Sequence, residues 1–465
     1  MNLYDLLASR FPADRTKACF ILSDRTEISY GALEAGVGRI AALMKDKGVG
    51  VGDRVALQAA KSPEGVMVYL AALKIGAVFL PLNQAYTASE VDYFLKDAEP
   101  AEFITDPVAF AAEAAGCAPI AETTPRADGD LAAIIYTSGT TGRSKGAMLS
   151  HGNLAANAIA LHQAWGFSPD DVLLHALPIF HVHGLFVALH CAFLSGCPMV
   201  WLAKFDDAEV LAGLKRASVM MGVPTFYTRL LAAPGFTREA AAHMRLFVCG
   251  SAPLLESTFA EFEARAGMPI LERYGMSEAV IITSNPLEGE RIAGSVGYPL
   301  PGVELRIGGG EATGVIEIRG PSVFGGYWRM PEKTAEEFTA DGFFITGDVG
   351  RQDPDGRVWI SGRAKDLIIS GGYNVYPKEV ELVLDEMAGV TESAVVGVPH
   401  PDFGEAVVAV VIGQGDEAAM IAAAREQLAA FKTPKRVFFV DDLPRNAMGK
   451  VQKNLLRERF GGTFG

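Results

Sequence analysis

The stretch LAAIIYTSGTTGRSKG, residues 131–146, decides how the surrounding chain is organised. Its first five residues form an apolar run typical of a buried strand, followed by two glycines and four hydroxyl side chains within residues 137–142. Glycines let successive backbone N–H groups turn toward one point, and hydroxyl groups add donors for phosphate oxygens. Because Lys145 adds a positive charge, the stretch predicts a phosphate-binding loop. The spacing differs from the GxxxxGK[ST] pattern of the standard kinase or GTPase loop. The alternative to a phosphate-binding loop is a flexible surface loop.

Helix and strand patterns alternate around this loop. Apolar residues recur at helical spacing within residues 33–43, and Ser62-Pro63 is typical of a capped helix start. The runs DRVALQAA (53–60) and AVFLPLN (77–83) indicate strands, and VLLHALP, PMVWLA, ASVMMGVP and MRLFVCG repeat that pattern. Alternation of this kind predicts parallel sheets covered by helices, and therefore an α/β fold.

The pattern changes near residue 295, where short β-rich pieces alternate with Gly and Pro. These pieces predict an antiparallel, barrel-like subdomain at the end of a large N-terminal domain, residues 1–364. A smaller α+β domain follows over residues 365–465. A chain of 465 residues is also too long for one compact core, which agrees with at least two domains.

Composition excludes several classes of protein. The net charge of −14 argues against non-specific nucleic-acid binding, and the five cysteines form no CxxC pair. The first residues lack a signal-peptide pattern. Residues 181–203 carry no Asp, Glu, Lys or Arg, but histidines, Gly196 and Pro198 favour a buried helix and strand over a membrane span. We expect a cytoplasmic protein with reduced thiols and no membrane segment.

Five motifs, in order, resemble those of the adenylate-forming enzymes, which include acyl- and aryl-CoA synthetases, peptide-synthetase adenylation domains and luciferases. They are YTSGTTGRSKGAMLSH (136–151), ERYGMSE (272–278), DGFFITGD (341–348), GRAKDLIISGGYNVYPKEVE (362–381) and PRNAMGK (444–450). The resemblance implies that residues 1–364 adenylate a carboxylic acid with ATP and Mg²⁺. It implies that the acyl group then passes to coenzyme A.

The same resemblance assigns the ATP site. It comprises Thr137, Ser138, Gly139, Thr140, Thr141, Gly142, Lys145, Tyr274, Gly275, Met276, Ser277, Asp348, Arg363 and Lys450. Glu278 is the expected Mg²⁺ ligand, because Mg²⁺ prefers a carboxylate together with phosphate oxygens. Asp348 has two acceptor oxygens suited to the ribose hydroxyls. Tyr274 is expected to stack on adenine, or else to be an ordinary core tyrosine.

The C-terminal motifs imply a mobile domain that turns about a hinge at Lys365. Lys450 would stabilise the reacting phosphate, although a Lys in a basic tail is otherwise an ordinary solvated residue. After rotation, the face bearing Ser370, Gly371, Gly372 and Tyr373 would admit coenzyme A. Thr137, Glu278 and His181 join Lys450 as expected catalytic residues.

Residues 176–185 lie where the acyl pocket of the family begins, and segments 183–186, 204–206, 222–231 and 284–297 resemble malonyl-CoA synthetases specifically. That resemblance implies an acyl pocket with Arg291 on the distal carboxylate, His183 beside it, and Ser251 and Met276 nearby. An arginine suits this task because it pairs bidentately with carboxylates. The plain alternatives are a surface ion pair of Arg291 with Glu288 or Glu290 and a hydrogen-bonded core histidine at 183.

The leading hypothesis is therefore a ligase that forms malonyl-CoA from malonate, ATP and coenzyme A through malonyl-AMP. A ligase for methylmalonate, succinate or acetate, a domain charging a carrier protein, and a non-catalytic nucleotide-binding protein remain alternatives. We expect a monomer or weak homodimer, and a lysine acetyltransferase is a candidate partner because acetylation of Lys450 would remove its charge.

Overall fold

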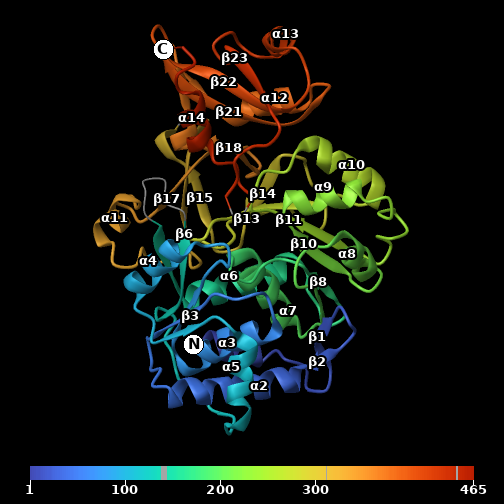
Figure 1. Cartoon of the computed structure of the whole chain (residues 1–465), viewed down its shortest axis with the longest axis vertical. Coiled ribbons are helices and arrows are strands. Elements are labelled where there is room, and N and C mark those ends of the chain that lie inside the picture. The colour runs from blue at the N-terminus through green and yellow to red at the C-terminus, as the bar shows by residue number, and fades with distance from the viewer. Residues whose placement is uncertain (138–143, 311, 447–448, 465) are drawn as a thin grey trace. The chain divides into compact units, whose positions relative to one another are not determined.

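The computed structural model describes residues 1–137, 144–310, 312–446 and 449–464. Contacts divide the chain into two compact units (Figure 1). The N-terminal unit comprises Met1–Glu304 and Ile318–Phe344, and the C-terminal unit comprises Leu305–Glu317 and Ile345–Gly465.

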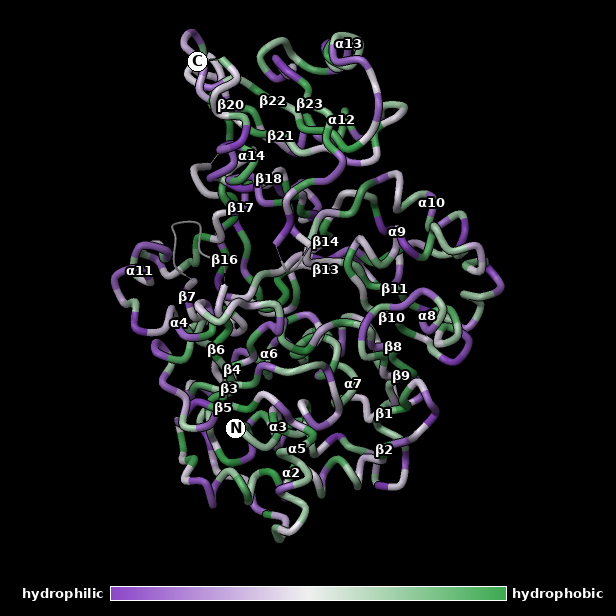
Figure 2. The backbone as a smooth tube through the Cα atoms, viewed as in Figure 1, coloured by the Kyte–Doolittle hydropathy of each residue, from purple (hydrophilic) through white to green (hydrophobic). Residues whose placement is uncertain are grey.

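The N-terminal unit contains a five-stranded sheet that carries the phosphate-loop motif. Its strands, in spatial order, are β5 (Glu102–Ile104), β3 (Arg54–Leu57), β4 (Val78–Pro81), β6 (Leu131–Thr137) and β7 (Lys145–Ser150). The first four run parallel, and β7 returns antiparallel to β6. Helix α2 (Tyr30–Asp46) buries an apolar stripe beside α3 (Pro63–Ile75), and hydrophobic and hydrophilic residues alternate along it (Figure 2).

A second, larger sheet of this unit is mostly parallel. The order is β14 (Ser295–Pro299), β13 (Thr283–Ser284), β12 (Leu271–Tyr274), β11 (Leu246–Cys249), β10 (Val219–Gly222), β8 (Leu173–His175), β9 (Met199–Trp201), β1 (Ala18–Leu22) and β2 (Glu27–Ser29). Residues of α8 (Asp207–Leu214), α9 (Pro224–Ala232) and α10 (Glu256–Ala266) share one buried apolar cluster with β8, β10 and β11. The functional segments follow the carboxyl ends of several of these strands, where parallel sheets place their sites.

The C-terminal unit combines a ribbon of four neighbouring strands, of which the last two run antiparallel, with a small α+β body. The ribbon consists of β15 (Glu304–Ile307), β16 (Thr313–Arg319), β17 (Phe344–Gln352) and β18 (Val358–Arg363). The body contains strands β20 (Tyr373–Val375), β19 (Ile368–Ser370), β22 (Gly404–Gly413) and β21 (Val390–His400), with β23 (Arg436–Val440) beside β22. Helices α12 (Pro377–Asp385), α13 (Glu417–Gln427) and α14 (Lys453–Phe460) complete it.

The sequence-based fold class is confirmed: a large N-terminal α/β sheet region precedes a small C-terminal α+β region. Ser62 caps α3 by accepting the N–H of Gly65 at 3.1 Å, with Pro63 at the first helical position, as predicted. The ribbon β15–β18 groups with the C-terminal residues because α12 packs against β18. The domain boundary and hinge at residues 364 and 365 stay predictions.

The apolar segment 181–203 folds as a buried helix and strand, as expected. It begins with a π-helical turn, His183–Ala188, continues as α7 (Leu189–Ser195) and ends in β9. Within the part of the chain that the structure describes, no helix has the length and apolarity needed to cross a membrane.

Candidate active site

The phosphate-loop motif lies between paired strands. Thr137 ends β6 and is paired across the sheet with Lys145, the first residue of β7. The predicted phosphate ligands Ser138, Gly139, Thr140, Thr141 and Gly142 lie outside the described residues. The antiparallel pairing of Thr137 with Lys145 defines the positions of the described residues on either side of this segment.

Lys145 is held in place by a carboxylate and an aromatic ring. Its Nζ lies 2.7 Å from Oε1 of Glu337 and 4.2 Å from the centre of the Tyr327 ring. Burial raises the pKa of Glu337, but hydrogen bonds from Lys145 and Tyr327 outweigh it, and the pKa ends below its usual value. Glu337 is therefore ionised at neutral pH, and Lys145 has a fixed anionic partner.

Glu278, the predicted metal ligand, is buried at the end of the turn that follows β12. The phenol oxygen of Tyr327 lies 3.1 Å from Oε1 of Glu278, and the backbone carbonyl of Glu278 accepts the N–H of Phe324 at 2.8 Å. Gly275 permits the turn, because a Cβ there would lie 2.0 Å from the carbonyl oxygen of Val280. Tyr274, Met276 and Ser277 are half-buried on the same turn. This arrangement keeps a hard oxygen donor at a defined place.

A metal site built only from protein groups is not present among the described residues, where no group of three or more His, Cys, Asp or Glu could hold an ion. Mg²⁺ commonly binds through one or two carboxylates, waters and substrate phosphates. The single buried carboxylate of Glu278 fits that mode of binding, with the triphosphate supplying further ligands.

The predicted ribose residues meet in the C-terminal unit. Asp348 and Arg363 are opposite one another on β17 and β18, and the Arg363 Nε lies 2.7 Å from the Asp348 Oδ1. Gly347 has a positive φ of 71°, which favours glycine immediately before the buried aspartate. The structure therefore brings together these two sequence-predicted residues, and the ion pair orients the carboxylate.

Two residues of the predicted acyl pocket, Ser251 and His183, contact each other near the ends of β11 and β12. Ser251 Oγ lies 3.3 Å from Nδ1 of His183, and Ser251 itself has a positive φ of 74°. His183 is buried on the π-helical turn, and its backbone N–H lies 3.3 Å from Nδ1 of the half-buried His181. Burial, followed by the charge of nearby Arg273, lowers the pKa of His183 well below its usual value. His183 is thus neutral at pH 7.

Arg273 is the residue that sequence reasoning missed. It lies on β12 with 4% of its surface exposed, and its Nε and Nη2 find no hydrogen-bond partner among the described residues. Burial lowers its pKa from 12.5 to about 10, so the guanidinium remains charged at neutral pH. Gly250 makes room for it, since a Cβ there would lie 2.5 Å from the Arg273 Cζ. The available sequence signal was a charged residue inside a short buried strand.

Arg291, the predicted carboxylate ligand, is engaged elsewhere. Its three nitrogens donate to the backbone carbonyls of Pro286, Pro269 and Leu287 at 3.1, 2.9 and 2.7 Å. A half-buried arginine with three carbonyl acceptors braces the loop that contains it. Its predicted contact with substrate stays untested, and it forms no ion pair with Glu288 or Glu290 within 4.0 Å.

The remaining predictions lie on the C-terminal unit. Lys450 is exposed, and its backbone N–H donates to Oδ1 of Asn446 at 3.0 Å, which closes a turn below it. Gly371 and Gly372, both with positive φ, form the tight turn between β19 and β20, where Ser370 is paired with Tyr373. Ser370 is buried, whereas Tyr373 is 60% exposed and stacks on Phe431.

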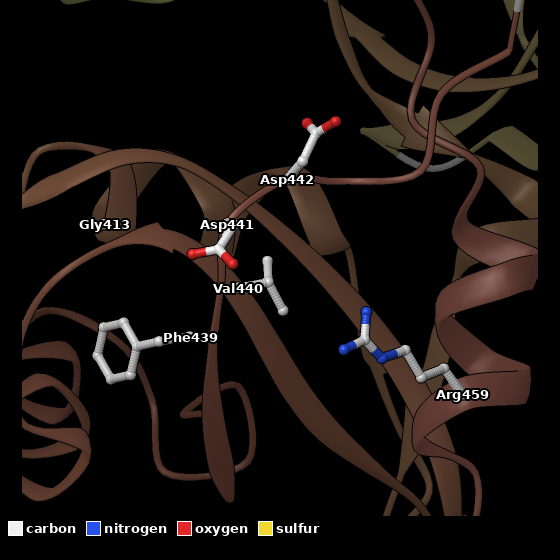
Figure 3. Close-up of a pocket in the computed structure, with 6 residues that line it drawn as sticks. All are labelled: Gly413, Phe439, Val440, Asp441, Asp442 and Arg459. Atoms are coloured by element: carbon white, nitrogen blue, oxygen red, sulfur yellow. The ribbon is translucent and has the colours of Figure 1, made fainter.

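A surface hollow in the C-terminal unit is unrelated to these motifs. It measures about 360 Å³ and is lined by Gly413, Phe439, Val440, Asp441, Asp442 and Arg459 (Figure 3). The carboxylates of Asp441 and Asp442 point in different directions (Figure 3). Since no sequence-predicted site residue lines it, this hollow is not the candidate active site.

Comparisons with known proteins show which proteins the chain resembles. The "Probable CoA ligase CCL8" of Humulus lupulus is 40% identical over 71% of this chain, and the match spans 61% of that protein. The "Malonate–CoA ligase" of Arabidopsis thaliana is 34% identical over 94% of this chain and 85% of that protein. The crystal structure of ATP-bound MatB from Rhodopseudomonas palustris has 50% identity and a TM-score of 0.96, covering 100% of this chain and 99% of that one.

Family models match in the same order along the chain. The AMP-binding enzyme model matches residues 6–328, and the AMP-binding enzyme C-terminal domain model matches residues 379–450. The first match covers the phosphate loop, Glu278 and the cluster around His183, and the second reaches Lys450. The chain belongs to the family of AMP-binding enzymes.

Proposed function

We propose that this enzyme is a malonate–CoA ligase, which joins malonate to coenzyme A and splits ATP into AMP and pyrophosphate. The observation that carries the choice of acid is the buried guanidinium of Arg273, which lacks a hydrogen-bond partner for two of its nitrogens among the described residues. The relatives that are named malonate–CoA ligases support the same choice.

Malonate keeps one negative charge after its other carboxylate has been activated. A carboxylate bound to Arg273 would satisfy the unpartnered N–H groups, and the Ser251 hydroxyl beside His183 could donate a further hydrogen bond. An acid without that second carboxylate would leave the guanidinium buried and unpaired, at a cost of about 3–5 kcal/mol. We therefore assign the distal carboxylate to Arg273 in place of Arg291.

The reaction proceeds in two steps. One malonate oxygen attacks the α-phosphorus of ATP, and pyrophosphate leaves to give malonyl-AMP. The thiol of coenzyme A then attacks the activated carbonyl carbon, and AMP leaves with the electrons of the broken C–O bond. The first step needs stabilised charge at phosphorus, which we assign to Lys450 and to the backbone of the phosphate loop.

Mg²⁺ would neutralise charge on the phosphate oxygens when it is bound. Glu278 would hold it, Asp348 and Arg363 would fix the ribose, and Lys145 would hold phosphate oxygens. For the second step, the face with Gly371 and Gly372 would admit the pantetheine arm after rotation about Lys365. These roles follow from the family resemblance and from side-chain chemistry.

Pyrophosphate release with Mg·ATP and coenzyme A tests the proposal across malonate, methylmalonate, succinate and acetate. We expect a preference for malonate, and Arg273→Ala should lower kcat/KM for malonate by about 100-fold or more. Arg291→Ala is the matched control and should retain the malonate preference. Activity on acetate that Arg273→Ala leaves unchanged would discard malonate as the substrate while keeping the family.

Methylmalonate remains the second candidate substrate. Residues 279–282, directly after Glu278, are the apolar and fully buried sequence AVII. If they border the acyl group, they would tolerate one methyl branch. A carrier protein could replace coenzyme A as the acceptor. Acyl transfer to a phosphopantetheine arm attached to a protein would identify that alternative. A cytoplasmic location, and a monomer or weak homodimer, remain part of the proposal.

A further inference from the structure

Four side chains form a continuous chain of contacts between the phosphate-loop lysine and the predicted metal ligand. Lys145 Nζ lies 2.7 Å from Oε1 of Glu337, and the other oxygen of Glu337 lies 2.7 Å from the Tyr327 phenol. The same phenol lies 3.1 Å from Oε1 of Glu278. We call this set the Tyr327 bridge: Lys145, Glu337, Tyr327 and Glu278. Only two of these residues belong to the motifs that indicate ATP binding.

The position of Tyr327 is strongly constrained. The residue is 3% exposed, its ring packs edge-on against Phe324 at 4.8 Å, and its backbone N–H donates to Thr334 Oγ1 at 2.9 Å. The preceding Gly326 allows this approach, since a Cβ there would lie 2.5 Å from Thr334 Cγ2. The phenol oxygen is therefore fixed by backbone and ring, independently of the carboxylates that it contacts.

Two other buried tyrosines of this unit donate to backbone carbonyls. Tyr30 donates to the carbonyl of Cys197 at 2.8 Å, and Tyr227 donates to the carbonyl of Val248 at 2.6 Å. Tyr327 instead places one donor between two carboxylates, an arrangement that structure alone does not require. Each carboxylate leads to a group expected to contact the triphosphate: Glu278 to the metal and, through Glu337, Lys145 to phosphate oxygens.

We propose that Tyr327 is a positioning residue that orients the Glu278 carboxylate for Mg²⁺ and, through Glu337, fixes the ammonium of Lys145 relative to it. This inference rests on the proposed ATP-dependent function. Mg²⁺ demands nearly ideal octahedral geometry, so the orientation of its carboxylate ligand matters. Hydrogen bonds to metal-ligating carboxylates typically change metal affinity by about 10–100-fold.

Tyr327→Phe tests the proposal because it removes the hydroxyl and keeps the ring that packs on Phe324 and beneath Lys145. Calorimetric titration with ATP, with and without Mg²⁺, measures how much the metal tightens ATP binding. We expect that metal-dependent gain to fall about tenfold or more in the variant. Metal-free ATP affinity should fall much less, because Lys145 keeps its ion pair with Glu337. The half-saturating Mg²⁺ concentration for pyrophosphate release should rise in parallel, with KM for malonate unchanged.

Tyr30→Phe is the matched control, because it also removes one buried phenol hydrogen bond but lies among no predicted site residues. The thermal unfolding midpoints of both variants without ligand measure the loss of stability, separately from any change in Mg²⁺-dependent ATP binding. If Tyr327→Phe loses stability like the control but keeps the wild-type gain from Mg²⁺, the inference is wrong. It is also wrong if ATP affinity falls equally with and without the metal. If the wild type fails to bind Mg·ATP, the proposed function fails before this inference is reached.

Discussion

At the residue scale, a buried histidine couples folding to pH. His151 begins α6 (His151–Ala164), and its Nδ1 accepts the backbone N–H of Leu3 at 3.0 Å. Burial, followed by the charge of Arg126, lowers the pKa of His151 from 6.5 to about 4. The neutral ring is therefore the form that the folded N-terminal unit requires.

This shift predicts the direction of an acid effect. Below pH 6.5 the unfolded chain binds a proton at His151, whereas the folded chain does so only near pH 4. The contribution of His151 to the free energy of unfolding should fall as pH drops through that window, by about 3 kcal/mol at most, and stay level below it. Scanning calorimetry from pH 7.5 to 4 measures the effect. His151→Asn keeps an acceptor for Leu3 without titrating, so a variant that loses as much stability as the wild type would contradict the prediction.

Two arginines, Arg273 and Arg291, are candidates for binding the distal carboxylate of the substrate. Arg273 and Arg291 have the same chemistry, and the sequence favoured Arg291 because its segment resembles malonyl-CoA synthetases. What distinguishes them is burial and partners: Arg291 donates to three carbonyls, whereas two nitrogens of Arg273 have no partner among the described residues. Partners of this kind depend on tertiary structure, which local sequence does not encode.

At the element scale, the turn that presents Lys450 is anchored by an arginine. Arg445 donates to the carbonyl of Gly449 at 2.9 Å and pairs with Glu392 of β21. The backbone N–H of Asn446 donates in turn to the carbonyl of Lys450 at 2.9 Å. These bonds attach the turn to the sheet of the C-terminal unit, so the exposed lysine projects from a supported backbone.

Removing that anchor should reduce adenylation without abolishing it. We expect Arg445→Ala to slow malonate-dependent pyrophosphate release by about tenfold, since a loosened turn misplaces the charge of Lys450. Transfer from preformed malonyl-AMP to coenzyme A should be unchanged, because that step does not use Lys450. Arg436→Ala, which breaks the more exposed pair with Glu417 in the same unit, is the control. Equal losses in both half-reactions would refute a role specific to the turn.

The elements themselves were largely predictable, and the exceptions are local. Periodicity located α2, and capping residues located the start of α3 at Pro63. The π-helical turn at His183–Ala188 was not predictable, because no sequence period distinguishes it from an α-helix. Gly184 shows what shapes it: a Cβ there would lie 2.0 Å from the carbonyl oxygen of Pro178. Gly184 and Pro178 approach each other only in the folded segment, so the sequence alone does not reveal this constraint.

At the scale of the whole molecule, the order of the motifs predicted the class of fold. The links between motifs could not be predicted. Tyr327 and Glu337 lie outside the motifs, yet they connect Lys145 to Glu278 through hydrogen bonds and an ion pair. Side chains that touch substrate occur in recognisable segments, whereas those that position them are recognised only once distant segments are brought together.

The predicted hinge residue, Lys365, lies between two ion-paired residues of the C-terminal unit. On one side of Lys365, Arg363 is paired with Asp348 at 2.7 Å, and on the other, Asp366 is paired with Arg457 of α14 at 2.6 Å. Partial desolvation lowers the pKa of Lys365 itself, although the residue is exposed. The backbone between two anchored residues is where a rotation would have to be absorbed.

Restricting that backbone should separate the two half-reactions. Lys365→Pro fixes φ near −65°, so we expect one half-reaction to slow by about tenfold or more while the other is retained. Malonate-dependent exchange of pyrophosphate into ATP measures adenylation, and preformed malonyl-AMP measures the coenzyme A step. Lys365→Ala, which removes the charge and keeps backbone freedom, should slow both steps less. If proline slows the two steps to the same extent, rotation about residue 365 does not separate them, and the hinge must lie elsewhere.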